Sequence, residues 1–236
     1  MYVLGKPDGK RRARLHDMTA RAYASRYSLR EEIANSVSHG VGALVAAGGL
    51  VVLIVLAALR GSVWHIVGCS VFGAALVLVY TISTLYHGIQ HPRAKAVLRA
   101  LDHSAIFILI AGTYTPFALV SLHGPWGWSL LGVIWGLTVL GIVLQMGLLR
   151  RGTAASVLLY LGMGWVVVIA IKPLLDAIGP DGVALLLVGG LGYTAGTGFY
   201  VWRRLPYHHA LWHGFVLLGS VSHFFAVLLY VIPTAT

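Results

Sequence analysis

Two histidines introduce the last long apolar segment of the sequence, and their spacing suits metal binding. His209 and His213 stand four residues apart at the start of a hydrophobic run that ends near Tyr230. If this run is a helix, both imidazoles lie on one face with their Cβ atoms about 6 Å apart. Such a pair can chelate one metal ion, but two ligands do not complete a site. The remaining ligands must come from other parts of the chain.

The composition predicts an integral membrane protein. Hydrophobic residues make up 58% of the chain, charged residues 10%, and the mean hydropathy is +0.83, whereas about a quarter of the residues of a soluble domain carry charge. Because a helix needs about 20 residues to cross a bilayer, 236 residues can hold seven spans joined by short loops. We therefore expect an all-α, seven-transmembrane helix bundle that forms one membrane domain over residues 39–236.

The apolar runs predict where the spans lie. Residues 1–38 hold eight Lys or Arg and are expected to form a basic cytoplasmic segment, with an interfacial helix from Asp17 onward. A basic loop is expected over residues 88–100. Pro116 is tolerable inside a span if neighbouring helices cover the freed carbonyl. The predicted spans are residues 39–59, 63–87, 101–121, 128–148, 154–171, 182–202 and 205–230.

The distribution of basic residues predicts the orientation of the chain. With a cytoplasmic N-terminus and seven spans, the inner segments hold fifteen of the seventeen Lys and Arg residues, and the outer segments hold only Arg60 and Lys172. This imbalance favours an inside N-terminus, an outside C-terminus and a multi-pass protein of the cell (inner or plasma) membrane. The net charge of +10 does not indicate a nucleic-acid partner, because the basic residues cluster between apolar runs.

This topology brings polar residues from three predicted spans to the cytoplasmic boundary. They are His87, Asp102, His103, His209 and His213. Ser83 lies one turn before His87, on the same helix face. Asp102 is the only acidic residue at an inner boundary of the predicted spans. Because a carboxylate is energetically costly at the edge of a membrane, its position suggests that it has an interaction partner. A bound metal ion would explain why these groups collect at one depth.

Four sequence motifs occur in a characteristic order from about residue 30 to the end. They are Glu32-x2-Asn35-x3-His39-x2-Gly42, Ser83-Thr84-Leu85-Tyr86-His87, Leu101-Asp102-His103-Ser104, and His209-x3-His213 with His223 beyond it. Together they resemble the haemolysin III family, the bacterial branch of the progestin and adiponectin receptor superfamily. The resemblance implies a seven-helix fold, a cytoplasmic N-terminus and a zinc ion near the inner face.

The resemblance also implies roles for individual residues. His87, His209 and His213 would hold the zinc, Asp102 would hold the water bound to it, and Ser83 would lie beside that water. Three protein ligands leave one tetrahedral position open, as in catalytic zinc sites, and zinc lowers the pKa of a bound water to about 7. Asp102 would orient this water or take its proton, and Ser83 would donate a hydrogen bond to an oxyanion.

Several of these residues also have structural interpretations. Asp102 can be a helix N-cap, and Ser83 can bond a carbonyl of its own helix. The first motif, from Glu32 to His39, is expected to cap and tether the first helix rather than touch the metal. His223, about 15 Å deeper than His213, is expected to make a buried hydrogen bond, with a proton or substrate path as the alternative. His103 receives no role.

These inferences support the hypothesis of a zinc-dependent intramembrane hydrolase, of the ceramidase kind, that cleaves an amide or ester of a membrane lipid at the inner leaflet. The substrate would contain a fatty acid. Two alternatives remain: a non-catalytic receptor or regulator of membrane homeostasis with a structural zinc, and a cytolytic haemolysin-like protein. A pore is disfavoured because the polar groups gather at one end of the spans instead of along them. Three histidines would also suit other first-row metals.

Overall fold

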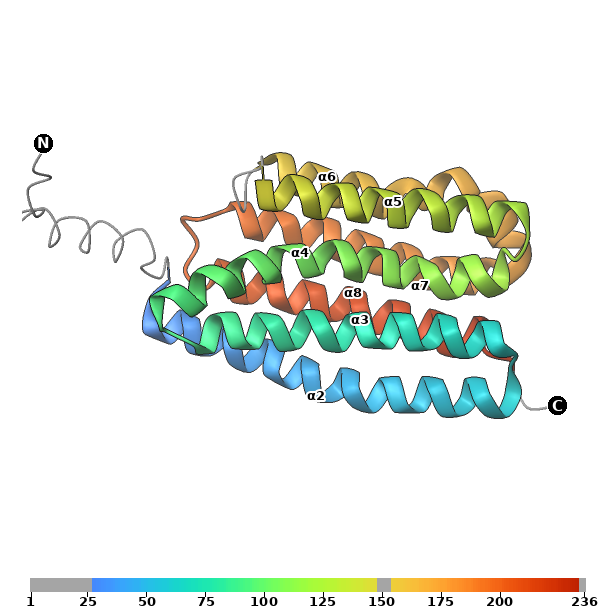
Figure 1. The fold of residues 1–236 in the computed structure, drawn as a ribbon, viewed down its shortest axis with the longest axis horizontal. Helices are drawn as coiled ribbons and strands as arrows, with labels where there is room; N and C mark the ends of the chain where they lie inside the picture. The colour runs from blue at the N-terminus through green and yellow to red at the C-terminus, as the bar shows by residue number, and fades with distance from the viewer. Residues whose placement is uncertain (1–26, 148–153, 234–236) are drawn as a thin grey trace, which may run out of the picture.

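The computed structural model describes residues 27–147 and 154–233, and all of its regular elements are helices that lie side by side along one long axis (Figure 1). No strand occurs within these two ranges. The α-helices are α2 (Leu29–Arg60), α3 (Val63–Gly88), α4 (Pro92–Pro116), α5 (Pro125–Gly147), α6 (Ala154–Trp165), α7 (Ile171–Val201) and α8 (His208–Tyr230). The interfacial helix predicted from Asp17 falls largely outside the described residues.

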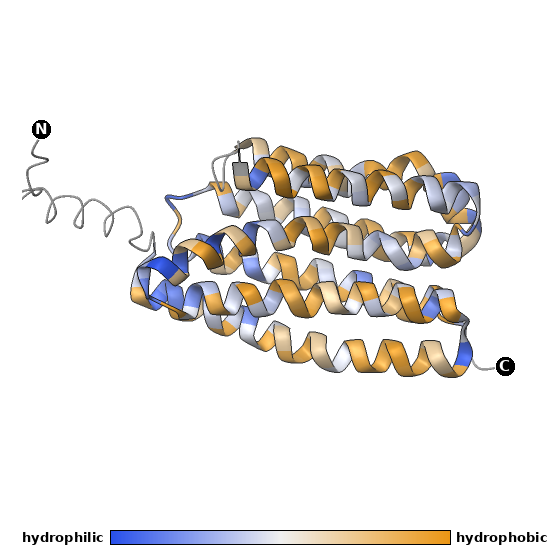
Figure 2. Cartoon of the chain, in the orientation of Figure 1, coloured by the Kyte–Doolittle hydropathy of each residue, from blue (hydrophilic) through white to orange (hydrophobic). Residues whose placement is uncertain are grey.

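The helices are long and apolar enough to cross a membrane. Among the described residues, six stretches meet this condition: Leu29–Arg60, Val63–Gly88, Pro92–Ser121, Pro125–Met146, Ala154–Val201 and His208–Tyr230. Large apolar side chains point outward, among them Leu44 at 77% exposure and Met146 at 68%, which is favourable only against lipid. Hydrophilic residues gather at the end of the bundle where α2 begins (Figure 2). The prediction of an all-helical membrane bundle is therefore confirmed.

The 48-residue stretch Ala154–Val201 does not run straight. Gly179, followed by Pro180, has a φ of 70° and a ψ of 174°, outside the helical region and in the range of φ that favours glycine. The indole nitrogen of Trp165 donates to the hydroxyl of Thr194 at 3.1 Å. A straight helix would separate these two residues by about 40 Å, so the chain doubles back at Gly179. The prediction of seven crossings depends on counting this stretch as two.

Helix α4 begins before the predicted third span. The loop predicted over residues 88–100 is wrong from Pro92 onward, because Pro92 occupies the first helical turn, where its missing N–H is not needed. Lys95, predicted as part of that loop, is a buried helical residue. At the other end, Pro116 closes α4 and the chain continues as a π-helix over Phe117–Ser121. A proline removes a backbone donor, and such a change of helix type absorbs the loss.

The start of α2 differs from the sequence prediction. The cap of this helix is Ser28, whose side chain accepts from the backbone N–H of Glu31 while the Glu31 carboxylate accepts from that of Ser28. The prediction that the motif from Glu32 to His39 caps the helix is therefore wrong. Glu32, Asn35 and His39 are buried instead, and they do tether α2, through contacts with α3 and α8 described below.

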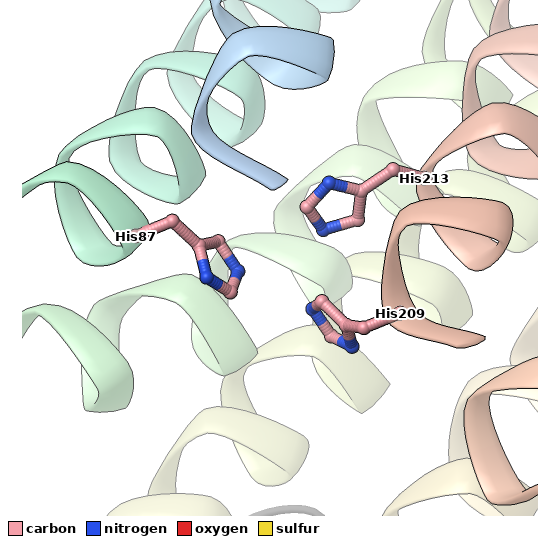
Figure 3. Close-up of side chains that lie close together, drawn as sticks. All are labelled: His87, His209 and His213. Atoms are coloured by element: carbon pink, nitrogen blue, oxygen red, sulfur yellow. The ribbon is translucent and has the colours of Figure 1, made fainter. Parts of the chain in front are cut away.

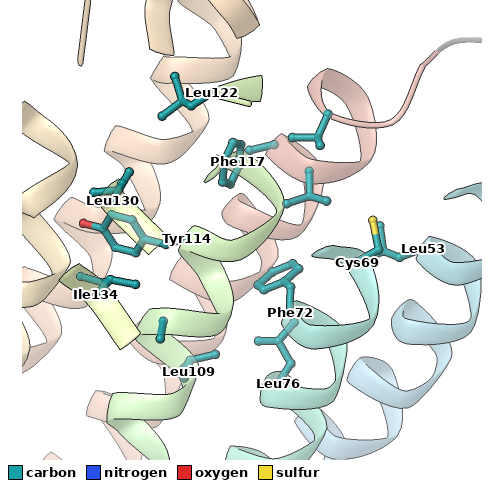
Figure 4. Close-up of a cluster of buried hydrophobic side chains, with 14 of the residues drawn as sticks. Leu53, Cys69, Phe72, Leu76, Leu109, Tyr114, Phe117, Leu122, Leu130 and Ile134 are labelled. Carbon is teal, nitrogen blue, oxygen red and sulfur yellow. The ribbon is translucent and has the colours of Figure 1, made fainter. Parts of the chain in front are cut away.

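A buried apolar cluster fixes the relative positions of the central helices. Phe72 and Leu76 of α3 lie against the face of α4 that carries Leu109 (Figure 4). Gly112 allows a close approach of these two helices, because a Cβ at this position would lie 2.6 Å from the Cβ of Ala75. Small residues are the usual means of close helix packing in lipid. The packing of α3 on α4 brings the ends of both helices to the polar end of the bundle.

Candidate metal centre

Three buried histidines converge at the polar end of the bundle. His87 comes from the last turn of α3, and His209 and His213 come from the first turns of α8 (Figure 3). One nitrogen from each ring can be chosen so that all three lie within 4.8 Å of one another. Nitrogens 2.0–2.1 Å from one zinc ion in a tetrahedral site stand about 3.4 Å apart, so the rings would have to close by up to about 1.4 Å to bind one ion.

The orientation of the His87 ring is fixed by a buried carboxylate. Its Nδ1 lies 2.6 Å from Oε2 of Glu32, whose Oε1 lies 2.8 Å from Nζ of Lys95. Lys95 also donates to the backbone carbonyl of Tyr86 at 3.0 Å. Because a carboxylate accepts hydrogen bonds, we assign the proton of His87 to Nδ1, which leaves the lone pair on Nε2. A carboxylate on the far ring nitrogen is a common arrangement around zinc-binding histidines.

The ring of His213 is oriented by α2 in a similar way. Its Nδ1 lies 3.2 Å from the backbone carbonyl oxygen of Asn35 and 3.0 Å from the hydroxyl of Ser38. Since a carbonyl can only accept, the proton again belongs on Nδ1 and the lone pair on Nε2. Helix α2 thus holds the proton of both candidate ligands on Nδ1, although His87 belongs to α3 and His213 to α8.

Two nitrogens of the cluster have no partner. Nε2 of His87 and Nδ1 of His209 are buried and make no hydrogen bond with any residue that the structure describes. Burying such groups without a partner is costly, and a metal ion would satisfy both. Three imidazoles, two of them with rings oriented by α2, are a donor set that suits zinc and other first-row metals. The residues present therefore fit the ion that the sequence motifs imply.

An internal cavity of about 150 Å³ opens beside the three histidines. His209 and His213 line it, and so do the two residues predicted to do chemistry, Asp102 and Ser83. Asp102 lies well inside α4, whose N-cap is His91, so the interpretation of Asp102 as a helix cap is wrong. The structure thus places both predicted residues at the same cavity as two of the candidate ligands, His209 and His213, and the chemical roles of Asp102 and Ser83 stay predictions.

Two further histidines complete the surroundings of the cavity. The ring of His39 stacks on that of His213, with centroids 3.4 Å apart and planes 10° apart, and both nitrogens of His39 are buried without a described partner. His103, which had no predicted role, lines the cavity, and its Nδ1 lies 2.9 Å from the Arg99 carbonyl of its own helix. His39 therefore belongs to the site, contrary to its predicted role in capping.

Comparison with known proteins identifies the relationship that the motifs indicated. The family model described as "Haemolysin-III related" matches residues 27–224. The chain belongs to the haemolysin III family. Among haemolysin III proteins, it is 47% identical to "Hemolysin-3" of Bacillus cereus, covering 88% of this chain and 95% of that protein, and 47% identical to a "Hemolysin-3 homolog" of Bacillus subtilis, covering 86% and 96%.

This haemolysin III protein also has a more distant similarity to an animal protein. The human "Monocyte to macrophage differentiation factor" is 24% identical over 214 residues, which cover 87% of each chain. This relative fits the progestin and adiponectin receptor superfamily.

The residues that hold the histidines in place were not predicted as part of the site. Glu32, Asn35 and His39 are spaced three and four residues apart, which puts them on one face of a helix. That spacing could have indicated a polar face turned toward the histidines. No local pattern marks Lys95, because its burial depends on the pairing with Glu32 across two helices.

Replacing Glu32 with glutamine should weaken metal binding. The amide is close in size but carries no charge, so it holds the Nδ1 proton of His87 less strongly and leaves the ammonium of Lys95 without its counter-ion. We expect the zinc affinity of the purified chain to fall about 10–100-fold, as is usual for such supporting residues, in a competition titration against a chromophoric chelator. Glu31→Gln is the matched control, because Glu31 is only partly buried and its carboxylate bonds Ser28 and the backbone of Tyr207 and not a candidate ligand. Equal losses in both variants would contradict the role of Glu32.

Proposed function

We propose that this haemolysin III protein is a zinc-dependent hydrolase that cleaves an amide or ester bond of a membrane lipid at the inner leaflet. The observation that carries the proposal is the buried cluster of His87, His209 and His213, which adjoins a cavity shared with Asp102 and Ser83. A purely structural zinc usually has four protein ligands, whereas a catalytic zinc keeps one position open. Three histidines beside a cavity correspond to the second arrangement.

In this proposal, different side chains bind the ion, accept a proton and stabilise the oxyanion. His87, His209 and His213 would hold the ion, which when bound supplies a Lewis acid that activates water and polarises a carbonyl. Asp102 would accept the proton that the attacking water gives up. Ser83, 2% exposed, would donate its hydroxyl to the oxyanion that forms on the scissile carbonyl. Glu32 and Asn35 would keep the rings of His87 and His213 in the productive orientation.

The cavity supports a lipid as substrate. The surface that it exposes is mostly apolar, and it continues away from the histidines between α4, α6, α7 and α8. An extended hydrocarbon chain would lie there while the carbonyl stays at the polar end, because apolar surface is stabilised by apolar contacts and the polar groups cluster near His209 and His213. The natural substrate class is therefore a lipid with a fatty-acyl chain.

We also propose a topology that places this site at the cytoplasmic side. The reversal at Gly179 supports counting Ala154–Val201 as two crossings, which gives seven in residues 39–236. The basic residues favour a cytoplasmic N-terminal segment over residues 1–38 and an outside C-terminus in the cell membrane. The histidine cluster would then lie at the inner leaflet boundary, within reach of lipid head groups.

Zinc analysis combined with a lipid screen tests the proposed function. The purified full chain should contain about one zinc ion and should release fatty acid from at least one member of a panel of ceramides and glycerolipids, as measured by mass spectrometry. A chelator should stop the release and added zinc should restore it. Stoichiometric zinc with no release from any lipid would favour the receptor alternative. Dye leakage from liposomes that contain the pure chain would favour the cytolytic alternative.

A further inference from the structure

A fourth histidine of α8 lies deep in the bundle and has a free acceptor. Nε2 of His223 lies 3.1 Å from the backbone carbonyl of Leu186 in α7. Since the carbonyl can only accept, Nε2 carries the proton and Nδ1 is a bare lone pair. This Nδ1 is buried, and no donor among the residues that the structure describes reaches it. The predicted buried hydrogen bond of His223 is confirmed, but it uses only one of the two ring nitrogens.

His223 stands where two internal cavities meet. The cavity beside the metal centre and a second cavity deeper in the bundle share the same lining residues at their junction. The shared residues are Thr113, Tyr114, Gly164, Trp165, Gly190 and His223. Together the two cavities form a mostly apolar path that starts at His209 and His213 and passes His223. A ligand long enough to fill the first cavity would therefore reach the free acceptor.

The surroundings leave this acceptor available to a ligand. The ring of Tyr193 lies 5.6 Å from that of His223 between centroids, and its hydroxyl lies 2.8 Å from the hydroxyl of Ser220, which also accepts from Tyr80 at 2.7 Å. The absence of a side chain at Gly189 admits the ring, because a Cβ there would lie within 2.3 Å of Nε2 of His223. The packing thus seats an imidazole at this depth and supplies no donor for its second nitrogen.

We propose that this deep site binds the hydroxyl group of a hydroxylated fatty-acyl chain whose carbonyl lies at the metal centre. The proposal rests on the proposed function for the position of the carbonyl. His213 and His223 are ten residues apart on α8, or about 15 Å. Because C–C bonds of about 1.5 Å zigzag along a chain, roughly twelve carbons cover that distance. The hydroxyl donates to Nδ1 of His223, so chains hydroxylated near carbon twelve are preferred over unsubstituted chains.

Equilibrium binding of two fatty acids to the purified zinc-loaded chain in nanodiscs tests the proposal. We expect 12-hydroxyoctadecanoic acid to bind about tenfold more tightly than octadecanoic acid, the effect of one buried hydrogen bond to an otherwise unpaired acceptor. In His223→Leu, which removes the acceptor and keeps an apolar side chain, the ratio should fall to near one. Equal affinity of the wild type for both acids, as expected if an ordered water satisfies Nδ1, overturns the proposal.

Two controls separate this result from the folding of the variant and from catalysis. His223→Leu should keep its zinc and its affinity for octadecanoic acid, and a ratio that stays at tenfold in this variant overturns the proposal. The isomer 3-hydroxyoctadecanoic acid should show no His223-dependent preference, and an equal preference for it also overturns the proposal. Because binding is measured and not turnover, a chain that hydrolyses no lipid can still show the preference. A hydrolase without the preference would leave the proposed function in place and end this inference.

Discussion

Replacing His209 with alanine should abolish both bound zinc and any hydrolytic activity. The variant would leave two of the three candidate ligands, His87 and His213, and two ligands hold zinc far more weakly than three. Elemental analysis of the purified variant should find zinc at background level, and the release of fatty acid from a lipid that the wild type cleaves should fall below detection.

The neighbouring histidine provides a matched control for this experiment. His208 is buried to a similar degree and belongs to the same first turn of α8, but its Nδ1 lies 3.1 Å from the carbonyl of Phe199. His208→Ala should therefore retain zinc and activity while losing a buried imidazole from the same place. Stoichiometric zinc in His209→Ala would end the assignment of the three-histidine site.

Replacing Asp102 with asparagine should separate metal binding from turnover. Asparagine has nearly the same shape as aspartate, but it does not accept a proton at neutral pH. If Asp102 is the general base, turnover should fall about 10²–10⁴-fold while the zinc content stays that of the wild type. The measurement pairs initial rates of fatty-acid release with elemental analysis of the same preparation.

A distant carboxylate gives the comparison for the Asp102 variant. Asp176 forms an exposed ion pair with Lys172, one turn away on α7, so Asp176→Asn changes the same chemical group far from the cavity. It should leave the rate unchanged. An Asp102→Asn protein that keeps its zinc and its full rate would exclude Asp102 as the base, and loss of zinc in that variant would make it a metal-site residue instead.

The sequence carried enough information to predict the helical class, and the resemblance of its motifs to the haemolysin III family implied the three candidate ligands. His209 and His213, four residues apart, lie on one face of α8. The unequal distribution of Lys and Arg between inner and outer segments placed them at the same membrane depth as His87. Both signals are local or depend on membrane depth alone, and neither requires knowledge of which helices touch. The contact of α2 with both α3 and α8 was beyond such signals.

The supporting residues show why the rest could not be predicted. Lys95 and Glu32 are both charged, and in a sequence a charged residue at the edge of an apolar run is normally solvated. They are buried here because each neutralises the other and Glu32 also accepts from His87. That arrangement exists only after three helices have met, so it is a property of tertiary structure.

The candidate ligands come from segments that are far apart in the order of synthesis. His87 lies in α3, whereas His209 and His213 lie in α8, and four helices are made between them. A ribosome delivers α3 to the bilayer long before α8 emerges, so His87 enters the lipid without its companion ligands. In the proposed site, a cation would be captured only when α8 has inserted against α2. Metallation would therefore be a late step of biogenesis that follows insertion of the helices instead of guiding it.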